Sequence, residues 1–247
     1  MDYDSFLDLV KTRRTIRRFR PDPIPNDCID KIIEAARWAP SGYNSQPWEF
    51  VVLRDKKLIN KMMQWIEDYW EYSRLAETAR ETWMRQTVHP WLDPEADFRN
   101  APAYILLLGD TRTQAGLPMT VRFDSTRRES IFTSSLASAY LYMALAAHTL
   151  GLASEWVSSV CLPYIQSMMR DLLGLPSYLE PYDMIALGYP ANRLGPKLLR
   201  PKEKMVHHDY CGPDDFRTDD EVKDFILRTR AWVSANHRKG IDKKMMA

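Results

Sequence analysis

Glycine is scarce in this sequence, and the few glycines are spaced too far apart for nucleotide-binding loops. The 247 residues include nine glycines, and no two of them lie two positions apart. Because the pattern G-x-G-x-x-G is missing, the sequence argues against a Rossmann dinucleotide site. The pattern G-x-x-x-x-G-K-[ST] is missing too, which argues against a P-loop. Neither the G-x-S-x-G elbow of serine hydrolases nor the H-E-x-x-H zinc motif occurs.

Cysteine is also rare, and neither sign of charge dominates. Cys28, Cys161 and Cys211 are an odd number of widely spaced residues, which is typical of neither a disulfide framework nor a zinc knuckle. With 34 Lys plus Arg against 33 Asp plus Glu, the net charge is +1, so we expect no nucleic-acid partner. The acidic start at residues 1–4 is not followed by an apolar run. We therefore expect no signal peptide and a cytoplasmic location.

Histidine offers little support for a metal site. Of the five histidines, only His207 and His208 are neighbours in the sequence. Adjacent side chains diverge on a strand or a helix, so this pair is more typical of a surface turn. We expect no metal centre.

One long stretch lacks charge altogether. Residues 130–154 contain no Asp, Glu, Lys or Arg, which is long enough to span a bilayer. Several serines and threonines and His148 make it a poor lipid-facing segment. We interpret it as part of a helix over about 128–150 that is buried in protein on all sides, and we expect no membrane contact.

The remaining pattern predicts helices alternating with a few strands. Apolar spacing and composition predict helices over 5–11, 26–38, 56–85, 163–173 and 219–236, followed by a frayed tail over 239–247. β-branched and aromatic runs predict strands over 48–53, 103–109, 152–160 and 184–187. Because the connecting helices are too long for hairpins, this order favours an α+β or three-layer fold.

Three segments carry side chains suited to binding. The first is Arg13-Arg14-Thr15-Ile16-Arg17, where guanidinium groups and a hydroxyl could cradle a phosphate or could simply form a solvated basic turn. The second is 39–48, Ala-Pro-Ser-Gly-Tyr-Asn-Ser-Gln-Pro-Trp, whose amides suit the edge of a heterocycle but also fit an ordinary turn. The third, Arg200-Pro201 after Gly188-Tyr189-Pro190, is uninformative alone.

Taken together and in this order, the three segments resemble the FMN-dependent nitroreductase family, within the nitroreductase and iodotyrosine deiodinase-like superfamily. The family opening R-R-[ST]-x-R-x-F is similar to residues 13–19, and its A-P-S-x-x-N-x-Q-P-W loop is similar to residues 39–48. Its late G-Y-P, R-P and V-H-x-D elements resemble residues 188–190, 200–201 and 206–209. The resemblance covers about residues 5–212.

The resemblance implies an α+β fold with three α/β/α layers around a central, mostly antiparallel mixed sheet. It further implies an obligate homodimer with two FMN molecules at the interface. Residues 1–214 would form the FMN-binding domain, with 60–100 as a variable, lid-like helical insertion. Residues 215–247 would form a C-terminal helix and tail. In such a dimer the uncharged helix would be buried between two protomers.

The resemblance also implies roles for individual residues. Arg13, Arg14 and Thr15 would bind the flavin phosphate and ribityl chain, and Lys197 and Arg200 would close on the phosphate. The second segment would meet the flavin or its ribityl chain through Pro40, Ser41, Asn44 and Gln46. The segment 155–159 would pass the flavin N5 edge, with Val157, Ser158 and Ser159 nearest. Its hydroxyls resemble the deiodinase branch, where a hydroxyl lies near N5.

The implied chemistry needs little from side chains, because FMN carries the redox step while the protein orients the reactants. A hydride from NADH or NADPH would reach N5, and a second substrate would take the electrons at the same face. We expect an electron-poor aromatic substrate, either a nitroaromatic or a quinone. The alternatives are reductive dehalogenation of halophenols, flavin destruction as in the branch that makes the lower ligand of cobalamin, and flavin binding without catalysis.

The insertion bears on the choice of substrate. Trp65, Trp70, Trp83 and Trp91 could stack on a planar substrate or could pack the helix onto the body. Asp68, Tyr72 and Trp91 stand at spacings similar to the lid of the deiodinases, which grip a zwitterionic amino acid with a Glu, a Tyr and a Lys. No lysine occurs from 62 to 196, and the place of the lid lysine falls near Asp93. This argues against iodotyrosine, unless Arg74, Arg80 or Arg85 supplies the cation.

Overall fold

Four strands form one sheet in the computed structural model, which describes residues 2–84, 98–192, 195 and 197–238. The strands are β1 (Trp48–Leu53), β2 (Ala103–Asp110), β3 (Ala153–Val157) and β4 (Leu179–Gly188), in the order β1-β2-β4-β3. All three neighbouring pairs are antiparallel, with Trp48 opposite Gly109 and Ala103 opposite Leu187. A single parallel bridge, Thr15 with Ser154, is recorded beside this sheet, so parallel pairing is limited to that contact in the described residues.

Seven α-helices connect and cover the strands in the described part of the chain. They are α1 (Tyr3–Thr12), α2 (Asn26–Arg37), α3 (Lys56–Glu77), α4 (Met119–Arg122), α5 (Ser125–Thr149), α6 (Pro163–Leu173) and α7 (Asp219–Arg238). Short 3-10 turns lie between them, including Gly42–Asn44 before β1 and Ser158–Cys161 after β3.

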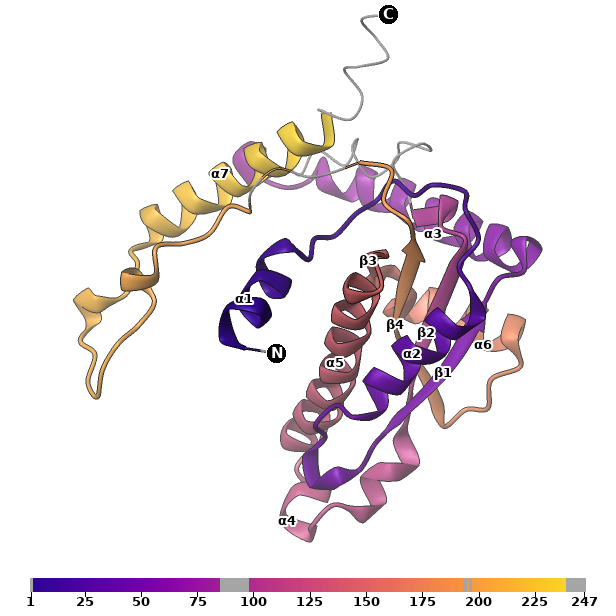
Figure 1. Ribbon diagram of the computed structural model, residues 1–247. Coiled ribbons are helices and arrows are strands. Elements are labelled where there is room, and N and C mark those ends of the chain that lie inside the picture. The colour runs from indigo at the N-terminus through magenta and orange to yellow at the C-terminus, as the bar shows by residue number, and fades with distance from the viewer. Residues whose placement is uncertain (1, 85–97, 193–194, 196, 239–247) are drawn as a thin grey trace, which may run out of the picture.

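The sheet has a hydrophobic core on each face, which produces the three expected layers (Figure 1). On one face, Ile32 of α2 and Leu136 of α5 pack with Ile105 and Ile185 of the central strands. On the other face, Met62 of α3 and Ile165 of α6 pack with Leu106 and with the other residues of the central strands that face this side. Because β2 is buried on both faces, it reads as a continuous apolar run in the sequence.

Helix α5 differs from the sequence prediction, because it is not covered on all sides within one chain. Its inner face is buried, with Leu136, Ala139 and Met143 fully inaccessible. Its outer face is open, and Leu141 is 47% exposed and Tyr142 37% exposed. A helix that packs on a single sheet layer buries one face only. By length and composition alone α5 could cross a membrane, but 44% of that apolar window is buried inside this protein.

Several other elements begin or end elsewhere than predicted. Strand β3 ends at Val157 rather than at residue 160, and a 3-10 turn over Ser158–Cys161 follows it. Helix α3 stops at Glu77 rather than near residue 85, and a 3-10 turn over Thr82–Met84 follows it. Strand β4 begins at Leu179, five residues before the predicted start at 184. Its extra residues include Pro181, where the register against β2 shifts, as expected for a residue that cannot donate to the ladder.

The C-terminal part of the chain leaves the body of the molecule. After β4 the chain runs away from the sheet, and α7 returns as a separate yellow helix well clear of β1 to β4 (Figure 1). Every residue from 201 to 221 is exposed. This C-terminal part of the chain, called the arm below, contacts the body through a hydrogen bond from Arg230 Nη1 to the Trp83 carbonyl at 3.2 Å, among other contacts.

Candidate functional site

The arginine-rich segment lies beside the edge strand of the sheet. Thr15 forms a parallel bridge with Ser154 at the start of β3, and the Ile16 amide donates to the Ser154 carbonyl at 3.0 Å. Next to it, Arg17 Nε lies 2.9 Å from Glu155 Oε1, and this glutamate is only 4% exposed. The ion pair holds Arg17 against β3, because a buried carboxylate needs its cationic partner.

Arg13 and Arg14 concentrate positive charge at this edge. Burial, and then the charge of Arg13, lower the pKa of Arg14 below its usual value. The same two causes lower the pKa of His148, whose Nε2 lies 2.9 Å from Thr12 Oγ1. Arg14 Nη1 donates to the Gly195 carbonyl at 2.5 Å, and neither arginine has an ion pair with a described carboxylate. Neighbouring cations repel one another, and a bound anion would relieve this repulsion. The group is therefore suited to bind an anion.

The late basic residues come near this group from the arm. Gly195, held by Arg14, lies two positions before the exposed Lys197. Arg200 is half-buried, and its Nη2 donates to the Lys204 carbonyl at 3.0 Å. The structure therefore ties the chain two residues before Lys197 to Arg14, while Arg200 contacts the backbone of Lys204.

The second segment forms a strained polar loop before β1. Tyr43, Asn44 and Gln46 adopt left-handed backbone angles, with φ of 55°, 52° and 43°. The backbone amide of Gln46 donates to Ser41 Oγ at 3.1 Å, and the Gln46 side-chain Nε2 donates to Asn44 Oδ1 at 3.2 Å. Asn44, Gln46 and Pro40 are exposed. Non-glycine residues in this region cost about 1–3 kcal/mol each and cluster at ligand sites.

Gly42 joins this loop to α5. Its amide donates to Ser135 Oγ at 3.1 Å, and a Cβ on it would lie 2.3 Å from Ile131 Cγ2. Only glycine allows the loop to approach the helix this closely.

The two groups of predicted binding residues lie near different parts of α5 within one chain. Gly42 of the loop contacts Ser135 in the first half of the helix, while Thr12, directly before the arginine segment, contacts His148 near its end. Thirteen residues of helix separate these contacts by about 20 Å. Figure 1 shows α1 beside the last turns of α5, whereas the loop lies near its first turns and α4. One chain therefore does not bring Arg13 and Arg14 next to Asn44 and Gln46.

The segment after β3 begins in the core and ends at the surface. The Val157 side chain is 3% exposed and belongs to the core, so only its backbone is available to a cofactor. Ser158 is exposed and Ser159 is half-buried in the following 3-10 turn. Of the three residues predicted here, Ser158 is the side chain best placed to meet a ligand.

A buried carboxyl that the sequence reading missed lies next to this segment. Asp183 on β4 is 6% exposed, and its Oδ2 accepts from Trp156 Nε1 at 2.7 Å. The Trp156 ring is 44% exposed and stacks on Tyr140 with centroids 3.8 Å apart. The strand was predicted to start at Met184, which left Asp183 outside it. The sequence offered one signal for this residue, which is that a carboxyl side chain directly precedes the apolar run 184–187.

Asp183 is expected to make stability depend on pH. Burial raises its pKa from 3.8 to about 6, although the Trp156 hydrogen bond opposes the shift. The folded chain then holds this proton more tightly than the unfolded chain, so the free energy of unfolding falls as pH rises from about 4 to 7. We expect the free energy of unfolding of Asp183→Asn, relative to that of the wild type, to rise by about 1–2 kcal/mol as the pH increases over that range. This figure allows for solvent screening.

Urea unfolding of both proteins across this pH range measures the difference. Asp171→Asn, which alters an exposed carboxylate on α6, is the matched control and should show no such gain. A difference between Asp183→Asn and wild type that stays constant with pH would contradict the account.

The predicted lid is only partly described. Trp65 is 9% exposed within the core, and Trp70 packs edge-on against Phe98, so these two favour the packing interpretation. Asp68 accepts from Gln64 at 3.0 Å, and Tyr72 is 68% exposed. Arg80, a candidate substrate cation, is paired with Glu77 at 3.0 Å. Trp91, Asp93 and Arg85 lie outside the described residues, as does the tail over 239–247.

Comparison with known proteins is consistent across sequence and structure. The model of the Nitroreductase family matches residues 10–189. A protein of Methanothermobacter thermautotrophicus named as an NADH dehydrogenase/NAD(P)H nitroreductase is 28% identical over 76% of this chain and 79% of its own. An iodotyrosine deiodinase of Thermotoga neapolitana is 28% identical over 81% of this chain and 94% of its own. An FMN-dependent nitroreductase of Clostridium difficile superposes with a TM-score of 0.60 at 22% identity, covering 83% and 99% of the two chains.

Proposed function

Because the chain belongs to the nitroreductase family, we propose that it is an FMN-dependent oxidoreductase that accepts a hydride from NADH or NADPH and reduces an electron-poor aromatic compound. One observation carries the proposal. The bridge between Thr15 and Ser154 places the arginine segment beside the strand that ends at Val157. Three residues along a strand span about 10 Å. A five-carbon ribityl chain and part of a flavin ring cover such a length between a phosphate and N5.

The donor set of the chain fits FMN. Arg13 and Arg14 would supply charged donors for the phosphate, Thr15 would supply a hydroxyl, and Lys197 follows two residues after Gly195, whose carbonyl accepts from Arg14. At the other end, the exposed Ser158 follows the strand. When bound, FMN supplies hydride acceptance and donation at N5. The protein's part is to hold the phosphate, expose one face of the ring and place a hydroxyl near its reactive edge.

We further propose that two chains complete each site. The loop with Asn44 and Gln46 lies about 20 Å from the arginine segment along α5 of the same chain. If the open faces of two α5 helices pack together around a two-fold axis, each loop moves toward the arginine segment of the partner chain. The exposed Leu141 and Tyr142 would then be buried between the chains. A cytoplasmic homodimer with residues 1–214 as its FMN-binding domain remains the expectation.

A second activity, reductive dehalogenation of halophenols, is favoured by one feature. The exposed Ser158 hydroxyl at the end of β3 suits a flavin N5 partner, and relatives named iodotyrosine deiodinase cover most of the chain. Iodotyrosine itself is disfavoured, since no lysine occurs from 62 to 196 to take the place of the lid lysine. Nitroaromatic or quinone reduction therefore stays the leading proposal.

The test is to reduce the flavin of the purified protein with light under anaerobic conditions and then add acceptors. We expect rapid reoxidation by a nitroaromatic or a quinone, followed by the absorbance of oxidised FMN. A reduced flavin that is reoxidised by a halophenol and not by a nitroaromatic would favour the dehalogenase. Inertness toward both classes would contradict catalysis and leave a flavin-binding protein.

A further inference from the structure

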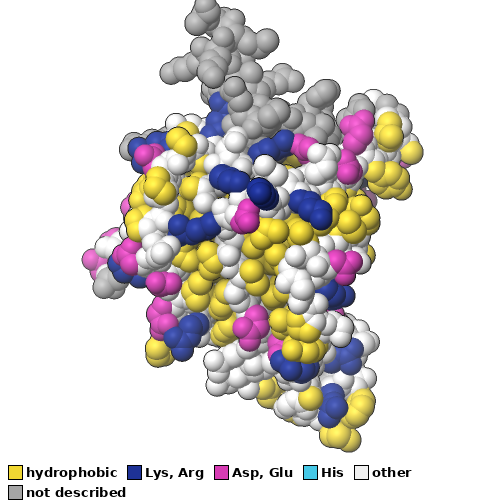
Figure 2. All heavy atoms as spheres, turned by 90° about the vertical axis from the view of Figure 1, so that its right-hand side faces the viewer, with side chains coloured by type: hydrophobic (Ala, Val, Ile, Leu, Met, Phe, Trp, Pro, Cys, Tyr) yellow, Lys and Arg dark blue, Asp and Glu magenta, His cyan; other side chains and the backbone are white. Residues whose placement is uncertain are grey.

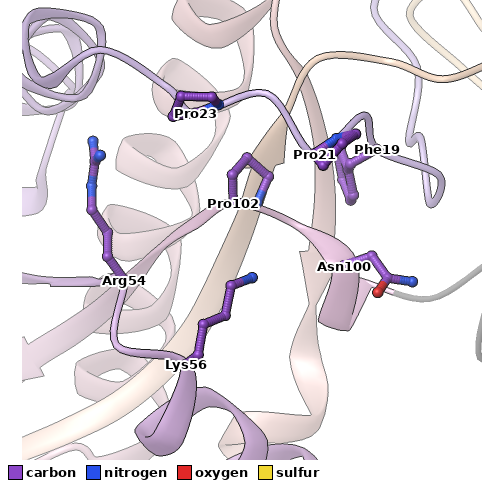
Figure 3. Close-up of a pocket in the computed structure, with 7 residues that line it drawn as sticks. All are labelled: Phe19, Pro21, Pro23, Arg54, Lys56, Asn100 and Pro102. Atoms are coloured by element: carbon purple, nitrogen blue, oxygen red, sulfur yellow. The ribbon is translucent and has the colours of Figure 1, made fainter.

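A cavity open to solvent lies where β1 ends and β2 begins, and none of the residues assigned to FMN lines it. Its volume is about 590 Å³, and it is lined by seven described residues: Phe19, Pro21, Pro23, Arg54, Lys56, Asn100 and Pro102. Small-molecule sites commonly span about 300–1,000 Å³. Figure 3 shows the Lys56 side chain leaning into the middle of the cavity below Pro102, with Arg54 standing apart at the left edge and Asn100 and Phe19 on the right.

Two cations enter this cavity from one short turn. Asp55, between β1 and α3, has an extended backbone with φ −68° and ψ 112°, so Arg54 and Lys56 can lie on the same side of the chain. The Asp55 carboxylate turns away and accepts from the Lys57 amide at 2.7 Å, which caps α3. The nearest acidic neighbour on the other wall, Asp22, is paired with Arg20 at 3.3 Å.

No acidic side chain is among the described residues that line the cavity. Arg54 and Lys56 also form no ion pair with any carboxylate in the described ranges of the chain. The positive end of the long helix α3 adds to the same field. The charge of this wall is therefore complementary to an anion.

The remaining walls are apolar and fixed in place. Phe19 is 8% exposed and bridges to Pro190, and its ring packs so close to Gly188 that a Cβ there would lie 2.7 Å away. Pro21 and Pro23 have restricted backbones. On the opposite wall, the Tyr104 hydroxyl donates to the Phe98 carbonyl at 2.5 Å and so anchors the turn that carries Asn100. A rigid apolar wall costs little further ordering when a ligand binds.

We propose that this cavity is a second ligand site that binds a small carboxylate with a flat apolar body, such as an arene carboxylate. The carboxylate meets Arg54 and Lys56, the ring lies against Phe19 and the prolines, and Asn100 contacts a polar substituent. A bare, strongly hydrated anion fits less well, because Phe19 and the three prolines offer no side-chain hydrogen bond to replace its water. The side of the molecule seen in Figure 2 likewise has hydrophobic side chains over its middle with Lys and Arg among them.

The experiment titrates 4-fluorobenzoate into the purified, flavin-loaded protein and follows its fluorine NMR signal. We expect saturable binding with a Kd below about 1 mM. Neutral 4-fluorobenzamide should bind at least about 10-fold more weakly, because it cannot pair with either cation. Inorganic phosphate at the same concentration should compete poorly.

Matched variants locate the ligand. Arg54→Gln combined with Lys56→Gln should weaken 4-fluorobenzoate binding at least about 10-fold. Lys57→Gln removes the adjacent lysine, which does not line the cavity, and should leave binding unchanged. The visible spectrum of the flavin should not change during the titration.

Several outcomes would overturn the proposal: no saturable binding, equal binding of the amide, equal competition by phosphate, or equal losses in Lys57→Gln. A flavin spectrum that shifts with the same Kd would place the ligand at the flavin instead. The titration does not depend on the flavin proposal, since a colourless protein would still report binding at Arg54 and Lys56.

Discussion

Arg14→Ala weakens FMN binding by about 10- to 150-fold, and Arg13→Ala has a similar effect. Hydrogen bonds to charged groups contribute about 1.5–3 kcal/mol each, and about 1.4 kcal/mol is tenfold in affinity. Both arginines lie beside β3 without a described carboxylate partner, so an anion is their natural complement. Riboflavin lacks the phosphate, and its binding should change much less. Fluorescence titration of flavin-free protein with FMN and with riboflavin measures both affinities.

Arg20→Ala is the matched control for this experiment. Arg20 belongs to the same arginine-rich stretch, but it pairs with Asp22 and lies over the Tyr189 ring. It should leave both affinities unchanged. Equal weakening of FMN and riboflavin by Arg14→Ala would show that the arginine supports the fold rather than the phosphate. Unchanged FMN affinity in both Arg13 and Arg14 variants would move the phosphate site to Lys197 and Arg200.

Leu141→Asp should dissociate the proposed dimer and release its FMN. Leu141 is 47% exposed on the open face of α5, so the folding of one chain tolerates a charge there. Between two α5 helices the same charge would be buried without a partner, which costs about 3–5 kcal/mol, and the symmetry of the dimer doubles the number of such charges. We expect the dissociation constant of the dimer to rise at least about 100-fold. Light scattering and flavin content measure the two effects.

Leu75→Asp is the control for this substitution. Leu75 is a helical leucine on α3 that is 58% exposed and lies away from α5. It should keep the dimer and its flavin. A wild-type protein that is a stable monomer at low micromolar concentration, or a Leu141→Asp protein that stays dimeric with full flavin, would contradict the two-chain site.

The strands that the sequence predicted best are those dense in aromatic, β-branched and other apolar residues. The run Trp48 to Leu53, interrupted only by Glu49, matches the observed β1, and the predicted β2 is one residue shorter than observed. Strand β4 was underestimated, since Glu180, Pro181 and Asp183 interrupt its apolar run. The end of α3 was overestimated, because residues beyond Glu77 keep a helical composition.

The candidate site was predicted by motif, while its geometry depends on tertiary structure. The sequence identified Arg13, Arg14, Asn44 and Gln46, but only the fold shows that their segments lie near different parts of α5, through the contacts of Thr12 with His148 and of Gly42 with Ser135. The pair of Arg17 with Glu155 and the contact of Trp156 with Asp183 join residues 138 and 27 positions apart, and no local pattern signals them. The cavity around Arg54 and Lys56 combines three separate segments and has no sequence motif.

The flavin content of the purified protein tests the central claim most directly. The protein is denatured, and the released cofactor is identified by chromatography and quantified by absorbance. We predict a yellow protein that releases one FMN per chain. A colourless protein that also fails to bind added FMN would contradict the account, because the arginine segment, the strained loop and the end of β3 would then have no common ligand.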